Sequence, residues 1–406
     1  MHGTSRENAS KKSTLGMVVL LGGLTAFGAL SIDMYLPALP VIAADFGASD
    51  GVVERSLATF LAGLALGQLF YGPLSDRIGR RPPLIAGIAI YVLASVLCAF
   101  AASPNMLAAL RFGQGLGACA GMVISRAIVR DVFDHQESAR VFSMIMLVFG
   151  LAPVLAPLLG SYLMVVTNWR AIFVFMTLFG LVMLYAIVFR LGETRSDATE
   201  ATARGEHPIA ALALLATNRK LLGYLLASAC NSACLFTYIS ASPALIMGTY
   251  GISPTGFGWL FGVNALGLIV ASQLNRVALA RFRADSVLAV ASIVAALFGF
   301  ALLALSLLNV GGLAAVMVML FGILSSFGFI MGNASAGALS VDPARSGSVS
   351  ALMGATGFTV GGLAMTITSL FADGTAIPMA AVMCLSLVIA AVAFFGLTRE
   401  GSPSRG

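Results

Sequence analysis

Long apolar runs separated by short polar turns dominate the chain. A helix needs about 20 mostly apolar residues to cross a bilayer. These runs are continuous, whereas the strands of a membrane β-barrel alternate apolar and polar residues. We therefore predict an all-α membrane protein with twelve transmembrane helices. The predicted spans begin near Leu15, Val52, Leu84, Met106, Ala139, Trp169, Lys220, Thr255, Ser286, Gly311, Ser346 and Ala376.

A polar linker separates the first six predicted spans from the last six. Between Arg190 and Arg219 the chain has many charged residues and few large apolar ones. Two six-helix halves joined by a loop are typical of transporters built from two repeats. We predict an N-terminal tail over 1–14, a six-helix bundle over 15–191, a linker over 192–218, a second bundle over 219–398 and a C-terminal tail over 399–406.

Composition supports the membrane assignment and indicates an orientation. The chain is 59% hydrophobic and 10% charged, whereas soluble domains have about 25% charged residues. The net charge of +6 fits basic cytoplasmic loops, so we predict no nucleic-acid partner. With the N-terminus in the cytoplasm, only Arg55 and Arg170 among the 23 Lys and Arg residues lie outside. We predict that both termini are cytoplasmic.

The residue inventory argues against metal binding and catalysis. All five cysteines fall inside apolar runs, where a thiol acts as a small packing residue. Cys230 and Cys234 are one helical turn apart, but no His or acid is near them in the sequence. No nucleophile–base pair or phosphate-binding loop is evident. We therefore predict no metal site and no enzymatic activity.

Asp33 interrupts the first apolar run, which extends from Leu15 to Leu39. A carboxylate at the centre of a membrane helix costs roughly 2.5–3.5 kcal/mol on insertion scales, so such residues are functional candidates. We expect Asp33 to be the only acid buried within the spans.

Arg111 and Gln114 in the fourth span are the matching basic and polar candidates. At 1.5 Å per residue, Arg111 and Asp33 each lie about 9 Å from the outer ends of their helices. We expect the two charges to face each other across a cavity, with a static ion pair as the alternative. Three glycines spaced by four between Gly113 and Gly121 are expected to pack on a neighbouring helix.

The loop between the second and third spans reads Gly-Pro-Leu-Ser-Asp-Arg-Ile-Gly-Arg-Arg-Pro over 72–82. A plain basic loop is the simpler interpretation. However, the string resembles the G-x-L-(S/A)-D-R-x-G-R-(R/K) signature of the major facilitator superfamily, which implies a charge network at a cytoplasmic gate. Its members here are Gly72, Asp76, Arg77, Gly79, Arg80 and Arg81.

The resemblance extends to one branch of that superfamily. The fifth span carries Gly150, Pro153, Pro157 and Gly160, similar to the G-P-x-x-G-P-x-x-G antiporter motif, with alanines replacing two glycines. The segments 33–40 and 67–73 resemble the Bcr/CflA drug:proton antiporters. The resemblance implies export of lipophilic drugs such as bicyclomycin, chloramphenicol or florfenicol from bacteria. It also implies the inner membrane and an acidic proton-coupling residue in the first span, which Asp33 matches.

This prediction requires a proton gradient and no cofactor. Burial favours the neutral acid, whereas the positive charge of Arg111 favours the carboxylate. Asp33 is therefore expected to take up and release protons, while Arg111 keeps a fixed positive charge. Its partners are the proton, a small lipophilic substrate and membrane lipids. The small-residue faces are expected to pack inside one bundle, which favours a monomer.

Cavity residues are the least specific prediction. The second half has no ionisable residue well inside its spans, so it is expected to supply shape and polar contacts, with helix packing as the alternative for each residue. Two other functions stay open, namely export of an endogenous metabolite or amino acid, and uncoupled facilitation. The cavity candidates are Tyr35, Gln114, Met146, Asn231, Phe236, Tyr238, Asn264 and Asn333.

Overall fold

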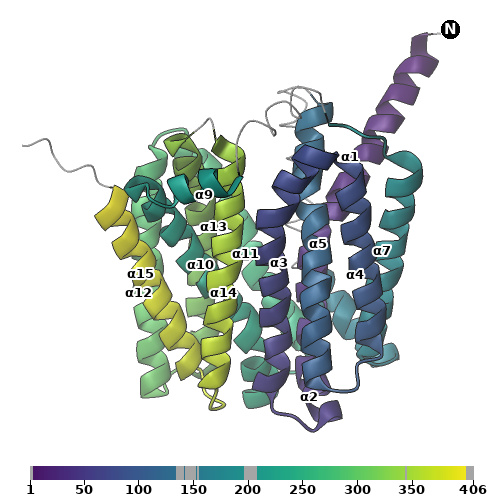
Figure 1. Cartoon of the computed structure of the whole chain (residues 1–406). Coiled ribbons are helices and arrows are strands. Elements are labelled where there is room, and N and C mark those ends of the chain that lie inside the picture. Colours follow the sequence, from purple (N-terminus) through teal and green to yellow (C-terminus); the bar gives the residue numbers. More distant parts are fainter. Residues whose placement is uncertain are drawn as a thin grey trace, which may run out of the picture.

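The computed structural model describes residues 3–133, 141, 152, 155–195, 208–342 and 345–398. All regular elements in this part of the chain are helical (Figure 1). Eleven helices are long and apolar enough to cross a membrane, which confirms the predicted fold class. Of the fifth predicted span, the described helix covers Leu155–Val166. The start predicted near Ala139 lies outside the described residues.

The first half packs around α5. Helix α5 contacts α1, α3 and α4, and α4 also contacts α7. In Figure 1 these helices run from purple through blue to teal and form one side of the molecule. Their bounds are α1 (Gly3–Asp33), α3 (Asp50–Ile78), α4 (Arg81–Ala99), α5 (Pro104–Val132) and α7 (Arg170–Arg190).

The second half packs around α10, which contacts α13, α14 and α15. Helix α12 contacts α13 and α15, and α13 contacts α11. The short helix α9 (Pro208–Leu215) precedes this half and contacts α14. The bounds are α10 (Arg219–Pro243), α11 (Pro254–Leu279), α12 (Ala284–Leu308), α13 (Gly312–Val341), α14 (Ser346–Leu370) and α15 (Ile377–Thr398).

The first span is interrupted, although its sequence predicts one continuous helix to Leu39. Helix α1 ends at Asp33, and the chain continues through η1 (Leu36–Ala38) into α2 (Leu39–Phe46). Pro37 and Pro40 stand in the first turns of the two short helices. Proline has no N–H to continue a helix and disfavours helical geometry in the preceding residue. Helix α10 likewise ends at Pro243 and continues as the π-helix η2 (Ala244–Thr249).

The two halves meet along α3 and α14, which lie side by side (Figure 1). We call the end that carries α2 the outer end, following the predicted topology, and the opposite end, with α9 and the start of α1, the inner end. At the outer end the Ser369 hydroxyl donates to the Gly51 carbonyl at 2.9 Å. The Ser161 hydroxyl donates to the Pro254 carbonyl at 3.2 Å. Contacts between the halves therefore close the outer end.

Candidate functional site

Asp33 lies where the two halves meet. It is the last residue of α1 and its side chain is buried. In the described part of the chain, no hydrogen bond or ion pair joins its carboxyl group to another residue. The adjoining η1 contacts α10 and α11 of the second half, and Asp33 is close enough to Tyr238 on α10 for an electrostatic interaction. Asp33 is thus a buried acid at the interface between the two halves.

Arg111 is completely buried in the first half. Its Nη2 donates to the Ser31 carbonyl at 2.9 Å, and its Nη1 donates to Gln114 Oε1 at 2.6 Å. The guanidinium carbon lies 4.6 Å from the centre of the Tyr35 ring and 4.3 Å from that of Phe60. Aromatic faces attract cations at these distances. A carbonyl, an amide and two rings thus stabilise the charge.

Arg111 and Asp33 do not form the static ion pair that was the alternative to two charges facing each other across a cavity. The ion pairs among the described residues do not include these two groups. Helical rise gives the depth of a residue but not the direction in which its side chain points. Here the guanidinium turns to the Ser31 carbonyl, which the break in α1 leaves without a helical partner.

A buried hydrogen-bond network surrounds Arg111. The Gln114 amide donates to Ser95 Oγ at 2.7 Å. The Tyr35 and Ser56 hydroxyls are bonded at 2.9 Å, and Ser31 Oγ bonds to the Tyr91 hydroxyl at 2.8 Å. Tyr35 and Gln114, both predicted to line a cavity, are therefore part of the packing around Arg111. Side-chain networks of this kind couple the positions of their members, although Arg111 Nε is buried without a hydrogen-bond partner in the described part of the chain.

On the side of the second half, the structure brings Tyr238 and Asn264 together. The Asn264 amide donates to the Tyr238 hydroxyl at 3.0 Å, and the Tyr238 ring stacks on Phe261. In the part of the chain that the structure describes, Oδ1 of Asn264 and Nδ2 of Asn231 are buried without a hydrogen-bond partner. Buried polar atoms normally have partners, and those that lack one mark positions for water or a ligand. The carbonyl and the amide can thus accept and donate one hydrogen bond each.

Two other cavity candidates lie in helix–helix contacts. The Asn333 amide donates to Asn275 Oδ1 at 2.9 Å, which joins α13 to α11. Phe236 packs on α14, with its ring 5.9 Å from that of Phe358 and close to Gly361. Met146 lies outside the described residues.

The predicted loop motif forms a charge network centred on Arg80. Its Nε donates to Asp131 Oδ2 at 2.7 Å, its Nη1 donates to Ser75 Oγ at 2.9 Å, and it forms an ion pair with Asp76. Burial by itself lowers the pKa of Arg80, but the carboxylates of Asp131 and Asp76 raise it above its usual value. The network ties the α3–α4 turn to the inner end of α5.

Glu193 completes this network and was not predicted. Its carboxylate accepts the backbone N–H groups of Arg80 at 2.8 Å and Arg81 at 3.2 Å. The close approach occurs at Gly79, whose φ of 99° suits glycine and where a Cβ would lie 2.5 Å from Glu193 Oε2. Arg195 then donates to the Arg77 carbonyl. In the sequence, the feature that could have pointed to Glu193 is its position as an acid directly after the sixth predicted span. At the other end of the motif, the Gly72 carbonyl accepts the Ser75 hydroxyl at 3.0 Å.

The fifth-span motif is described in part. Gly150 and Pro153 lie outside the described residues. The Pro157 carbonyl accepts the Ser161 hydroxyl at 2.8 Å. A side chain at Gly160 would collide with the Met34 backbone. Gly160 therefore allows this helix to approach the chain directly after Asp33.

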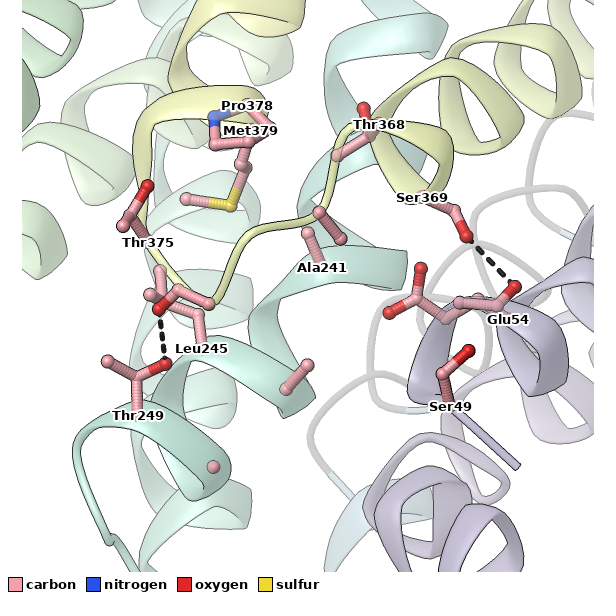
Figure 2. Close-up of a pocket in the computed structure, with 15 residues that line it drawn as sticks. Ser49, Glu54, Ala241, Leu245, Thr249, Thr368, Ser369, Thr375, Pro378 and Met379 are labelled. Carbon is pink, nitrogen blue, oxygen red and sulfur yellow. Dashed lines mark hydrogen bonds between the residues drawn. The ribbon is translucent and has the colours of Figure 1, made fainter. Parts of the chain in front are cut away.

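Glu54 is a second buried acid, so the expectation that Asp33 would be alone is wrong. Glu54 lies in the membrane-spanning α3 and is 4% exposed. The Ser240 hydroxyl on α10 donates to Glu54 Oε2 at 3.4 Å. Because Glu54 lies near the predicted start of the second span, the sequence suggested that its side chain is exposed at a helix end. Instead, the second half covers it, and it lines a pocket between the halves (Figure 2).

Comparisons with known proteins agree with this architecture. The profile of the Major Facilitator Superfamily matches residues 21–366. The uncharacterized MFS-type transporter YdgK of Bacillus subtilis (strain 168) is 35% identical over 399 residues, which are 97% of this chain and 98% of the relative. The bicyclomycin resistance protein homolog of Haemophilus influenzae is 32% identical over 98% of this chain and 99% of its own length.

Other relatives match less of the chain or share only the fold. The multidrug resistance protein MdtL of Escherichia coli (strain K12 / DH10B) is 35% identical over 58% of this chain and 59% of its own length. A crystal structure of a D-xylose-proton symporter has a TM-score of 0.72 at 15% identity and covers 95% of this chain and 98% of the symporter. An inward-facing bacterial homolog to the human lysosomal transporter Spinster has a TM-score of 0.71, at the same identity and the same coverage of both chains. The chain is therefore a multi-pass membrane transporter, not an enzyme, and belongs to the Major Facilitator Superfamily.

Proposed function

We propose that this transporter is a proton-coupled exporter of small lipophilic compounds, with antibiotics of the bicyclomycin and chloramphenicol/florfenicol types among its substrates. The observation that carries the proposal is Asp33, a buried acid at a break in α1 that lies within electrostatic range of Tyr238 of the second half. Intramembrane acids at such positions are typical of proton-coupled transport. The bicyclomycin and multidrug resistance relatives support the substrate class.

In this mechanism the Asp33 carboxylate takes up a proton from the outer side and releases it to the cytoplasm. Substrate binds between the halves while Asp33 is ionised, using the free polar atoms of Asn231 and Asn264. Protonation removes the negative charge, weakens substrate binding and allows the empty protein to return. Arg111 keeps a fixed positive charge and holds Ser31, two residues before Asp33. We propose that a single chain in the bacterial inner membrane, with both termini cytoplasmic, carries out this cycle.

The test uses purified protein in proteoliposomes with an acidic lumen that contains a pH-sensitive dye. Protein with its cytoplasmic face outward exchanges external drug for luminal protons. Addition of chloramphenicol, florfenicol or bicyclomycin is therefore expected to raise the luminal pH for the wild type. The Asp33→Asn variant is expected to abolish this response. Asp45→Asn replaces a half-exposed acid of α2 and serves as the matched control, with the response retained.

Each outcome has a distinct meaning. If Asp33→Asn still accumulates labelled drug against its gradient, Asp33 does not couple transport to protons. If the folded wild type gives no response to any of the three drugs, the proposed drug class is wrong. The same assay with metabolites and amino acids then tests export of an endogenous compound.

A further inference from the structure

The outer end contains a pocket that the proposed proton cycle does not use. Its volume is about 400 Å³, within the range of roughly 300–1,000 Å³ typical of small-molecule sites. Residues from α3, α10, η2, α14 and the start of α15 line it, so both halves contribute walls (Figure 2). The turn at Gly374 and Thr375 closes another side, where the Thr249 hydroxyl donates to the Gly374 carbonyl at 2.7 Å.

Glu54 gives the pocket one strongly polar side. It is the one ionisable residue among the described residues that line the pocket, and it is more than nine-tenths buried. Figure 2 shows its carboxyl group directed from α3 towards Ala241 on α10. Serine and threonine hydroxyls surround the same space, from Ser49, Thr368 and Ser369 among others. The Ser240 hydroxyl donates to Glu54 Oε2 at 3.4 Å, and an acid at this position attracts a cation that enters the space.

The opposite side of the pocket is apolar. Leu245, Pro378 and Met379 line it, together with Ala244 and Ala372. Met is unbranched and adapts to ligands of different shape. The wall at η2 is a π-helix, a conformation found frequently at functional sites. One anionic side and one apolar side match a ligand with a positive head and a short hydrophobic body.

We infer that this outer pocket is a binding site for small lipophilic ammonium compounds, with Glu54 facing the ammonium group and Met379 and Leu245 facing the apolar group. The site is distinct from Asp33 and does not depend on proton coupling. Because both halves form its walls, the ligand binds the conformation in which the outer end is closed and stabilises that conformation.

The test measures equilibrium binding of tritiated phenyltrimethylammonium to the purified full-length protein in detergent at pH 7.5, by scintillation proximity. This probe is permanently charged, so its own protonation does not vary. Its neutral isostere, tert-butylbenzene, has nearly the same shape. We expect saturable binding that unlabelled probe competes away, and at least tenfold weaker competition by tert-butylbenzene.

Two kinds of variant locate the binding site. Glu54→Gln removes the charge and keeps the shape, and is expected to weaken binding at least tenfold, whereas Glu54→Asp is expected to retain a measurable part of it. Gly248→Leu adds a bulky side chain at the pocket wall without altering Glu54, because Gly248 lines the pocket and an added Cβ there meets no atom within 4 Å. Gly396→Leu is the matched control, since its Cβ position is also open and it lies near the inner end of α15.

The inference is supported if Glu54→Gln and Gly248→Leu lose binding while Gly396→Leu and Asp33→Asn retain it. It is overturned if Glu54→Gln binds the probe as tightly as the wild type, or if tert-butylbenzene competes equally well. Loss of binding in Asp33→Asn together with retention in Glu54→Gln also overturns it, because the probe then occupies the central site. Absence of saturable binding in the wild type overturns it as well.

Discussion

At the scale of single residues, Arg111 carries a buried charge in an unusual way. Among the described residues its partners are a backbone carbonyl, a side-chain amide and two aromatic rings. Each cation–π contact contributes about 0.5–2 kcal/mol, more when it is desolvated. Such a charge needs no carboxylate beside it, which leaves Asp33 free to change its protonation state without breaking an ion pair.

Replacing Arg111 is expected to destabilise the first half. Arg111→Ala leaves the Ser31 carbonyl and the Gln114 amide oxygen unpaired, at about 1–3 kcal/mol for each buried group. Arg111→Lys keeps the charge but loses the planar geometry, so its effect should be smaller. Unfolding in mixed micelles measures the free energies. Arg126→Ala, at an exposed position of the same helix, is the control, and a fully stable Arg111→Ala would contradict the prediction.

Glu193 predicts a dependence of stability on pH. Partial desolvation by itself raises the pKa of Glu193. However, the backbone N–H groups of Arg195, Arg80, Arg81 and Thr194 donate to the carboxylate, and these hydrogen bonds hold the pKa of Glu193 below its usual value. Because the pKa is lowered in the folded protein, the ionised Glu193 stabilises the fold fully at pH values above its ordinary pKa of 4.5. This contribution is lost as the pH falls through the lowered pKa of the folded state.

Thermal unfolding in detergent between pH 7 and pH 3, with Glu193→Gln beside the wild type, checks this expectation. The wild type should be the more stable protein at pH 7, and the difference should shrink towards pH 3. A difference that stays constant over this range would mean that the carboxylate charge is not responsible.

At the scale of elements, glycine sets how closely the helices of the first half approach. Added side chains at Gly63 and Gly115 would collide with backbone atoms of the facing helix, α5 and α3 respectively. Gly117 faces α4, where a Cβ would lie 2.5 Å from the Tyr91 nitrogen, and Gly121 faces α1. The predicted packing role fits Gly117 and Gly121. At Gly113, however, the nearest atom to an added Cβ is Ala94 Cβ at 3.8 Å.

Two glycines two residues apart therefore respond differently to alanine. Gly115→Ala forces α3 and α5 apart along a tightly packed contact and should give an unstable or aggregated protein. Gly113→Ala finds room for its methyl group and should stabilise α5 by about 0.5–1 kcal/mol, because alanine loses less entropy in a helix. Size-exclusion profiles and unfolding free energies of the two variants decide this. Equal behaviour would show that the helix contact tolerates a methyl group.

The sequence predicts elements far better than it predicts their interruptions and partners. Continuous hydropathy indicates where a span begins, so the described span starts agree with the predicted ones to within a few residues. Hydropathy does not register the break after Asp33, because Met34 to Leu39 are apolar or aromatic in either backbone geometry. Burial of Glu54 depends on residues almost 200 positions later in the chain, and no local pattern contains that information.

At the scale of the whole molecule, the two halves are closed against each other at the outer end. Ser369 of α14 bonds to Gly51 of α3, and an added Cβ at Gly51 would lie 2.7 Å from the Ser369 hydroxyl. Alternating access requires such contacts to separate during each cycle. We call this contact between Gly51 and Ser369 the outer seam. A covalent link at the outer seam is therefore expected to stop transport.

A cysteine pair tests this requirement. In the double variant Gly51→Cys and Ser369→Cys, the Cβ atoms come close to the separation of about 3.5–4.5 Å that a disulfide needs. Oxidation should abolish drug–proton exchange in proteoliposomes, and a reductant should restore it. Each single variant is a control, since the five native cysteines are buried. Undiminished exchange by the fully oxidised double variant would show that the outer seam does not open.

The bond between Arg111 and Ser31 also determines where a helix stops. In an unbroken α1 the Ser31 carbonyl would accept the N–H of Tyr35, but that N–H bonds to Ile32 instead, and the guanidinium occupies the vacated acceptor. Every carbonyl exposed by ending a helix inside a membrane needs such a substitute. Arg111 thus acts as a terminator placed on a different helix. Arg111 fixes Asp33 as the final residue of α1. A residue of α5 therefore determines the direction in which the Asp33 side chain points from α1.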